Sequence, residues 1–104
     1  GSTIITVVLQ TILNVLSFNM GIAEAASVPR IHHQWLPDQV FFESGISKDT
    51  LQILTNMGHR LGAKPRILGS TQSIQRGQYN STLGVSDPRR QGAGAVAQDT
   101  SNQR

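Results

Sequence analysis

Side chains capable of acid–base or metal chemistry gather in one short stretch of the chain. They are His32, His33, Asp38 and Glu43, with His59 farther along. Adjacent histidines on an extended segment point to opposite sides, and no His-x-x-x-His spacing places two rings on one helix face. We therefore expect the histidines to pack and hydrogen-bond around Trp35 and predict no metal site. The carboxylates Asp38 and Glu43 could pair as general acid and base, but their spacing does not require it.

Several common catalytic patterns are absent from the 104 residues. The nucleophile elbow G-x-S-x-G, the P-loop and the dinucleotide fingerprint G-x-G-x-x-G do not occur. There is no cysteine, which excludes disulfides, thiolate zinc sites and cysteine nucleophiles.

The charge is positive, with nine Lys and Arg against six Asp and Glu and a formal net charge of +3. Residues 60–90 hold six basic side chains and one acidic one, whereas residues 1–29 contain Glu24 as their single charge. The basic residues are scattered, and Tyr79 is the one aromatic among them, so a base-stacking platform is lacking. We do not expect nucleic-acid binding.

The elements that would position such groups begin with an apolar helix predicted over residues 4–18. Its polar residues Thr6, Gln10, Asn14 and Ser17 are spaced four, four and three apart, which aligns them as one narrow stripe. A helix that is apolar on all other sides is typical of burial between layers. Ser2 or Thr3 is the expected N-cap, and the free N–H groups of the first turn make that end partially positive.

An apolar run of this kind could also be a transmembrane span or a secretory signal. A transmembrane span needs about 20 predominantly apolar residues, and this run is shorter and interrupted by Gln10 and Asn14. A secretory signal is the better rival, because Ala23-Glu24-Ala25 resembles an A-x-A cleavage site, although no basic segment or initiator Met precedes it. The alternative function is thus a small exported binding or interaction protein with residues 1–25 as a signal-like segment.

Beyond the first helix the pattern alternates between short elements. A helical turn over residues 22–27 ends before Pro29, and residues 40–43 predict a strand. Ser47 is the expected N-cap of a further helix that ends near Gly58. Residues 71–75 and 82–86 flank a turn and predict a hairpin. We expect residues 1–88 to form the ordered portion and residues 89–104 a largely disordered tail.

Five motifs, in order along the chain, resemble the C-terminal part of the small subunit of γ-glutamyltranspeptidase in its bacterial form. They are Gly1-Ser2 with Ile4-Ile5-Thr6, Ala23-Glu24-Ala25, the run from Pro29 to Asp38, Gly69-Ser70-Thr71-Gln72-Ser73, and Ser86-Asp87-Pro88-Arg89. The resemblance extends to about residue 97. It implies an α+β fold, the αββα layered sandwich of N-terminal-nucleophile hydrolases, present here only as a partial domain.

The resemblance also implies an activity. The full-length relative is a self-cleaving precursor that transfers a γ-glutamyl group from glutathione or a similar compound to water or to an amino acid or peptide acceptor. Its nucleophile is a threonine that this chain lacks, and it needs no cofactor. The expected partners are the large subunit and the rest of the small subunit, and the expected location is periplasmic or extracellular. The chain by itself is expected to be inactive.

Three residues receive roles from the resemblance. Gly1 aligns with the second glycine of a pair whose backbone N–H groups bind substrate and stabilise the oxyanion, which agrees with its place before a helix N-terminus. Arg30 and Arg89 lie in two of the motifs, and we expect each guanidinium to act as a structural clamp on a carboxylate or on carbonyl groups.

Overall fold

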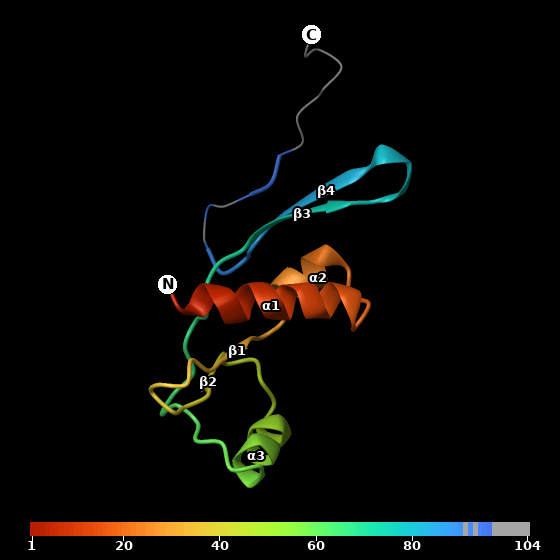
Figure 1. Ribbon diagram of the computed structural model, residues 1–104. Helices are drawn as coiled ribbons and strands as arrows, with labels where there is room; N and C mark the ends of the chain where they lie inside the picture. Colours follow the sequence, from red (N-terminus) through yellow and green to blue (C-terminus); the bar gives the residue numbers. More distant parts are fainter. Residues whose placement is uncertain (91, 93, 97–104) are drawn as a thin grey trace.

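The computed structural model describes residues 1–90, 92 and 94–96 of the chain. Its elements follow the order in Figure 1: α1 (Thr3–Leu16), α2 (Ile22–Ser27), β1 (Ile31–His32), β2 (Phe41–Phe42), α3 (Lys48–Asn56), β3 (Gln72–Arg76), the 3-10 turn η1 (Gln78–Asn80) and β4 (Thr82–Ser86). Helices α1 and α2 occupy the middle. The β1–β2 pair with α3 lies on one side of them, and the β3–β4 hairpin lies on the other.

Helix α1 forms where the apolar run predicts it, but it presents its polar stripe to the rest of the chain. The Gln10 side-chain amide donates to the backbone oxygen of Ile31 at 2.6 Å and accepts from the Ile31 N–H at 3.0 Å. Asn14 donates to the backbone oxygen of Ala25 at 3.4 Å. The polar side chains therefore dock α1 onto the segments that follow it.

The apolar side of α1 is largely exposed in this chain, contrary to the expected burial. Val7 and Thr11 are its buried residues, whereas Ile5 and Leu16 are each 74% exposed. Helices normally turn their apolar stripe toward the core. Here the docking face is polar, and the described residues supply no layer over the apolar side, so the expected burial between layers is not completed within this chain.

The expected hydroxyl cap of α1 is also absent. Ser2 occupies the N-cap position but makes no capping hydrogen bond, and its hydroxyl donates to the Gln34 side-chain oxygen at 2.9 Å. Ser2 has helical backbone angles, φ −65° and ψ −26°, whereas a capping residue usually adopts an extended conformation. The N–H groups of the first turn are therefore not covered by a side chain of that residue.

Helix α3 begins and ends as its sequence indicates. The Ser47 hydroxyl accepts from the Thr50 N–H at 3.1 Å, which is a regular N-cap. Gly58 follows the helix at φ +99°, in the left-handed region that glycine adopts without a Cβ clash. The apolar residues of α3 stay outside any core, since Ile53 and Met57 are both more than half exposed.

The two predicted strand regions form two separate antiparallel pairs. β1 pairs with β2 over two residues, which is shorter than the predicted strand at residues 40–43, and Val40 instead forms a single parallel bridge with Leu61. β3 pairs with β4 over five residues, from Gln72 opposite Ser86 to Arg76 opposite Thr82. The predicted hairpin is thus confirmed within one residue at each strand.

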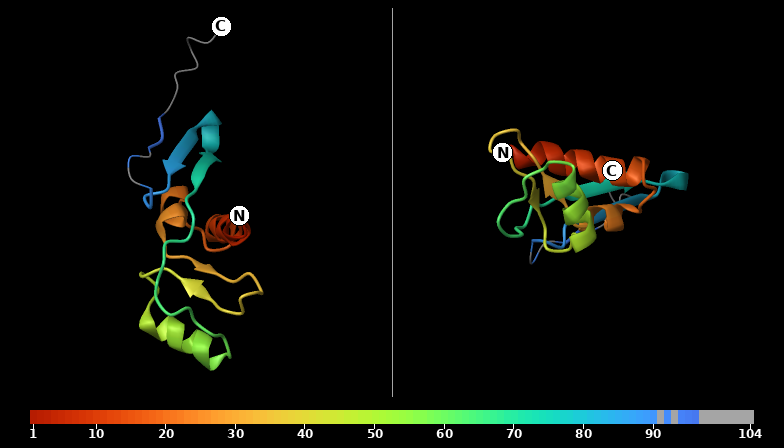
Figure 2. Two further views of the ribbon diagram at one scale, coloured as in Figure 1. Left: turned by 90° about the vertical axis from the view of Figure 1, so that its left-hand side faces the viewer. Right: turned by 90° about the horizontal axis from the view of Figure 1, so that it is seen from below.

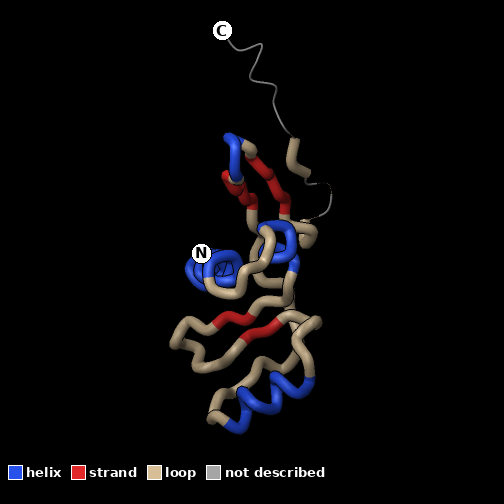
Figure 3. The backbone as a smooth tube through the Cα atoms, turned by 90° about the vertical axis from the view of Figure 1, so that its right-hand side faces the viewer, coloured by secondary structure: helices blue, strands red, loops and turns tan. Residues whose placement is uncertain are grey.

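These pairs do not stack into layers within the described residues, so the layered sandwich is not visible in this chain alone. Figures 2 and 3 show the two sheets on opposite sides of the α1 and α2 pair. The apolar interior is small, and the fully buried side chains of greatest volume are Arg30, Leu68, His32 and Asp87. At Gly69, with φ +73°, the chain passes close to α1, and a Cβ there would lie 3.1 Å from a Val7 methyl. The middle of the molecule is therefore held largely by polar groups.

The exposed side of α1 predicts how the isolated chain behaves. A contiguous apolar face of this kind is unusual on a stable monomer. We expect the purified 104-residue chain to self-associate and to lack a cooperative melting transition, as measured by sedimentation velocity and calorimetry. The double variant Ile5→Lys/Leu9→Lys should reduce association several-fold.

The matched control is Gln52→Lys/Thr55→Lys, which adds the same charge on α3 and should leave association unchanged. A compact, cooperatively melting monomer of the unsubstituted chain would contradict this prediction.

Candidate functional site

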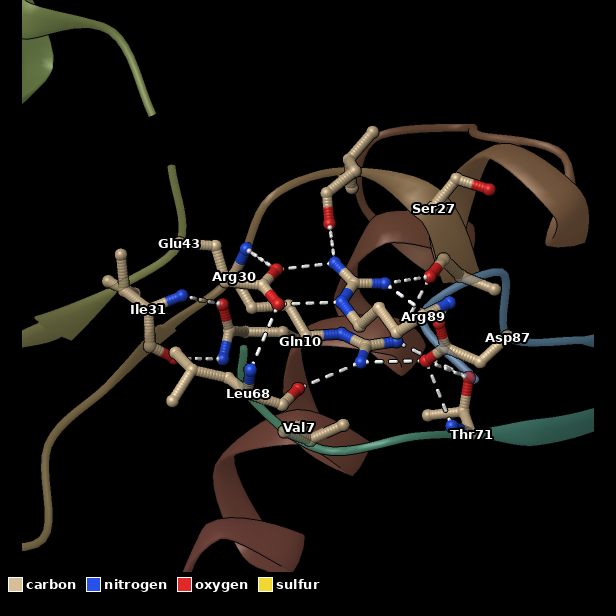
Figure 4. A network of polar contacts seen from close by, with 12 residues as sticks. Val7, Gln10, Ser27, Arg30, Ile31, Glu43, Leu68, Thr71, Asp87 and Arg89 are labelled. Carbon is tan, nitrogen blue, oxygen red and sulfur yellow. Dashed lines mark hydrogen bonds and ion pairs between the residues drawn. The ribbon is translucent and has the colours of Figure 1, made fainter. Parts of the chain in front are cut away.

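Four charged side chains from distant parts of the chain meet beside α1 and α2. Arg30 follows α2, Glu43 follows β2, and Asp87 and Arg89 follow β4. Figure 4 shows the two guanidinium groups side by side, with Glu43 against Arg89 and Asp87 against both. We call these four residues the ionic network.

Arg30 is almost completely buried, with 1% of its surface exposed. Its Nη1 lies 2.8 Å from the Asp87 carboxylate and donates to the backbone oxygen of Leu68 at 3.0 Å. Its Nη2 donates to the backbone oxygen of Ala26 at 3.0 Å. This guanidinium therefore joins the end of α2 to the segments that precede β3 and follow β4.

Arg89 makes the second set of contacts. Its Nε donates to Glu43 Oε2 at 2.6 Å and its Nη2 to Glu43 Oε1, so the carboxylate is held at both oxygens. Its Nη1 donates to the backbone oxygen of Ala26 at 2.7 Å, and Nη2 donates to that of Val28 at 2.8 Å. Arg89 thus fixes the segment after β4 to the end of α2.

The carboxylates also accept hydrogen bonds from the backbone. Glu43 accepts from the Arg30 N–H at 2.8 Å and from the Leu68 N–H at 2.9 Å. Asp87 accepts from the N–H groups of Thr71 and Arg89, both at 2.9 Å. A buried carboxylate needs such donors on all its lone pairs, because it has left water.

These surroundings keep both acids ionised. Burial by itself would raise the pKa of Asp87, but hydrogen bonds from the Arg89 and Thr71 N–H groups and from both arginine side chains lower that pKa from 3.8 to about 2. The pKa of Glu43 is lowered as well, since the Arg89 hydrogen bond and the backbone donors outweigh burial. The hydrogen bond to Glu43 raises the pKa of Arg89. The network is therefore two ionised pairs and is not suited to exchange protons near neutral pH.

The histidines and Asp38 lie apart from the network. His32 is buried and hydrogen-bonds Thr6 and Gln34, while His33 Nε2 contacts Asp38 Oδ1 at 3.1 Å near the surface. The Trp35 N–H donates to His33 Nδ1 at 3.0 Å, so the expected hydrogen bonding occurs at its backbone, but its side chain is 77% exposed and the expected packing around it is wrong. Asp38 and Glu43 do not pair. Within residues 1–90, 92 and 94–96, no three His, Asp or Glu side chains gather as a metal-binding group.

Gly1 lies exposed at the start of α1, at the edge of an open groove of about 1070 Å³. The groove runs between the apolar face of α1 and residues 66–76. It is separate from the ionic network. The structure therefore brings Arg30 and Arg89 together but leaves Gly1 at another place, near His32 and Gln34. Among the described helices, none has both the length and the apolar character needed to cross a bilayer.

Residues 1–97 match the family described as Gamma-glutamyltranspeptidase. This chain belongs to that family. The glutathione hydrolase proenzyme of Escherichia coli is 47% identical over 89 residues, which are 86% of this chain and 15% of that protein. The proenzyme of Bacillus subtilis strain 168 is 40% identical over 94 residues, 89% of this chain and 16% of that protein. The chain thus spans about 15% of the length of these curated relatives.

Solved γ-glutamyltranspeptidases share the fold. A mutant of the Helicobacter pylori enzyme superposes with a TM-score of 0.77 at 41% identity, covering 86% of this chain and 50% of that one. The Pseudomonas nitroreducens enzyme in complex with L-DON gives a TM-score of 0.81 at 30% identity, covering 94% and 52%. The small sheets and helices described above therefore match about half of each of these solved γ-glutamyltranspeptidase chains. The family match includes residues 1–25, which disfavours their interpretation as an export signal.

The sequence reasoning missed two members of the network. Glu43 is considered only as an acid–base partner of Asp38, and Asp87 enters only as part of the motif Ser86-Asp87-Pro88-Arg89. An isolated carboxylate in a β-branched and aromatic stretch is the signal that could have identified Glu43, since a strand otherwise suited to burial needs a partner for it. Arg89, assigned to the tail, has its side chain inside the network. Residues 91, 93 and 97–104 of that tail lie outside the described residues.

The geometry of Arg89 predicts a large loss of stability on conservative substitution. A lysine keeps the charge but cannot hold Glu43 at both oxygens while reaching two carbonyl groups. In a chimeric enzyme, with residues 1–97 replacing the matching segment of the Escherichia coli relative, we expect Arg89→Lys to lower the free energy of unfolding by about 3 kcal/mol.

Arg60→Lys, at an exposed arginine, is the control and should change stability by less than about 0.5 kcal/mol. Urea denaturation measures both, and equal effects of the two substitutions would contradict a special role for the ionic network.

The lowered pKa of Asp87 predicts a specific pH dependence. A carboxylate whose pKa is lower in the folded state stabilises the protein above its unfolded pKa and loses that contribution as pH falls through the folded value. For Asp87 the window runs from 3.8 down to about 2, and the contribution amounts to about 2 kcal/mol. We expect Asp87→Asn to destabilise the chimeric enzyme at pH 5, with the difference shrinking toward pH 2.5.

The urea midpoints of the parent chimera and of its Asp87→Asn variant, measured between about pH 5 and pH 2.5, give this difference in stability. Asp38→Asn removes a carboxylate at the surface and serves as the control. An Asp87→Asn difference that stays constant with pH would show that Asp87 is not held ionised by the network.

Proposed function

We propose that the full-length protein containing this chain is a γ-glutamyltransferase and glutathione hydrolase. It transfers a γ-glutamyl group from glutathione or a similar compound to water, an amino acid or a peptide, through a threonine ester. The observation that carries the proposal is the family match over residues 1–97 together with 47% identity to the Escherichia coli hydrolase. The chain forms the second half of the small subunit, and the αββα layers are completed by the first half. By the same likeness, the enzyme acts in the periplasm or outside the cell.

The nucleophilic threonine belongs to a part of the protein outside this chain. Thr6 and Thr11 lie within α1, where the Thr11 hydroxyl donates to the backbone oxygen of Val7 at 2.9 Å. Thr3 is the first residue of the same helix. None of the three carries a free α-amine, which the threonine of such an enzyme uses as its own base. Acyl transfer of this kind requires positioned groups and no cofactor.

Gly1 is proposed to bind substrate and to stabilise the oxyanion through its backbone N–H. In the full-length protein its nitrogen is a peptide amide at the positive end of α1. No acidic side chain lies in the first turn of α1, so none there competes with a developing negative charge. A Cβ at Gly1 would meet no atom within 4 Å, so this position is open to approach.

Arg30 and Arg89 are proposed to be structural clamps. Both donate to the backbone oxygen of Ala26, at 3.0 and 2.7 Å, and both pair with Asp87, while Arg89 also holds Glu43. A solved relative that is 41% identical is described as showing critical roles for its C-terminus in autoprocessing and catalysis. Arg89 lies near the C-terminal end of the family match, so we infer that the clamp supports the same processes here.

The apolar side of α1 indicates where the partners lie. The solved relatives contain as much chain again as this one, and the groove of about 1070 Å³ along α1 is lined by Val8, Ile12 and Leu16 among others. Burying such side chains stabilises a protein by about 25 cal/mol per Å². The rest of the small subunit, with the large subunit around it, is proposed to cover this face.

The test of the proposed function is activity in the chimeric enzyme. With residues 1–97 in place, we expect cleavage into two subunits and release of 4-nitroaniline from γ-glutamyl-4-nitroanilide. The 104-residue chain alone should release none, because it lacks the nucleophile.

A chimera that folds and is processed but does not cleave the anilide would contradict the assigned function. Release of 4-nitroaniline by the isolated chain would contradict the claim that it is inactive alone.

A further inference from the structure

We infer that Gln34, held in place by His32, is a positioning residue for the first turn of α1 and for the Gly1 N–H in front of it. The inference rests on the oxyanion role proposed for Gly1. It is carried by a chain of hydrogen bonds that leaves α1 at Thr6, passes through His32 and Gln34, and returns to α1 at Ser2. We call this chain the α1 bracket.

Gln34 is fixed by three contacts to its side-chain amide. Its nitrogen donates to the backbone oxygen of Leu36 at 2.9 Å, which determines which end of the amide carries the oxygen. That oxygen accepts from the Ser2 hydroxyl at 2.9 Å and lies 2.9 Å from His32 Nε2. Both lone pairs of the oxygen are therefore used, and the amide has no freedom to rotate without breaking a contact.

His32 gives the bracket its rigidity. The Gln34 oxygen can only accept, so His32 carries a proton on Nε2, and its Nδ1 is in hydrogen-bond contact with the Thr6 hydroxyl, which also lies 3.2 Å from the backbone oxygen of Thr3. The residue is 1% exposed and its ring stacks on Phe41 with 6.1 Å between centroids. The imidazole is thus locked between the sheet and the helix and sets the position of Gln34.

The two ends of the bracket lie one helical turn apart. Ser2 and Thr6 are related by four residues, so they share one face of α1. Ser2 contacts Gln34 and Thr6 contacts His32, and these two partners are themselves joined by a hydrogen bond. The two contacts together fix the orientation of the first turn as well as its distance from β1. A single hydrogen bond would leave the turn free to rotate about that contact.

The bracket also explains why Ser2 does not cap its own helix. Its hydroxyl is directed to Gln34, and no side-chain cap forms at the N-cap position. The Ile4 N–H donates to the Gly1 backbone oxygen at 3.2 Å, whereas the other first-turn N–H groups, of which a capping hydroxyl would normally occupy one, have no acceptor from Ser2. A helix start held rigidly from the side and left uncapped is suited to receive an external negative charge.

Kinetic variants of the chimeric enzyme test the inference. Gln34→Ala and Ser2→Ala should each lower kcat for γ-glutamyl-4-nitroanilide by about tenfold, with KM changed less than about twofold, because oxyanion contacts act mainly in the transition state. Rates are expressed per mole of processed small subunit. The double variant should be little worse than either single one, and Ser2→Thr, which keeps the hydroxyl, should retain activity.

Gln10→Ala is the matched control. It also removes two hydrogen bonds between α1 and β1, but about two turns farther along the helix. Its kcat should stay near that of the parent even where its stability falls. If Gln10→Ala lowers kcat as much as Gln34→Ala, or if Gln34→Ala changes only the yield of folded enzyme, the inference is overturned.

Hydrogen exchange separates this inference from the proposed function. In Gln34→Ala, amides of the first turn of α1 should exchange at least tenfold faster than in the parent, whereas Gln10→Ala should affect the middle of the helix. If the first-turn amides exchange faster in Gln34→Ala but the chimera has no transferase activity, the result would support the bracket and contradict the proposed function. Unchanged exchange in the first turn would overturn the bracket whatever the activity.

Discussion

The arrangement of this chain depends on the burial of two arginines with two carboxylates where a larger apolar core would otherwise lie. Removing four charges from water costs free energy, and the cost is offset only if every charged atom finds close partners. Arg30 and Arg89 meet this requirement by sharing Asp87 and the Ala26 carbonyl, except at Arg30 Nε, which is buried without a partner among the described residues. Glu43 meets it by taking two backbone N–H groups as well. Because these partners lie up to 63 residues apart, the geometry admits few alternative arrangements of the segments around α2.

Polar contacts also determine how α1 packs against the rest of the chain. Its docking face is the stripe of Thr6, Gln10 and Asn14, which bond to His32 and to backbone groups of residues 31 and 25. Hydrogen bonds specify orientation more closely than apolar contact does, because their strength depends on angle as well as distance. The apolar face remains for a second layer. One helix thus presents a polar face to its own chain and leaves its apolar face exposed.

Local features of the fold could be predicted from the sequence, and long-range ones could not. The Ser47 cap, the helix end at Gly58 and the turn between β3 and β4 depend on neighbouring residues, so propensity and spacing locate them. The orientation of α1 was not accessible in this way, since a narrow polar stripe on an apolar helix indicates a solvent face as readily as a polar seam. Nor could the spacing of Glu43 and Asp87 show that both meet Arg89. The predicted capping hydrogen bond of Ser2 is absent for a related reason, because Gln34, 32 positions away, accepts its hydroxyl proton instead.

The ionic network and the α1 bracket stabilise different parts of the structure around α1. The network acts at the C-terminal end of α2 and joins strands on both sides, so its loss would loosen the whole arrangement. The bracket acts on the first turn of α1, where Ser2 and Thr6 meet Gln34 and His32. A catalytic N–H must be held within about half an ångström of its productive place, which is a narrower tolerance than folding alone imposes. With the oxyanion role proposed for Gly1, that difference is the physical reason for a separate, rigid set of contacts at this end of the helix.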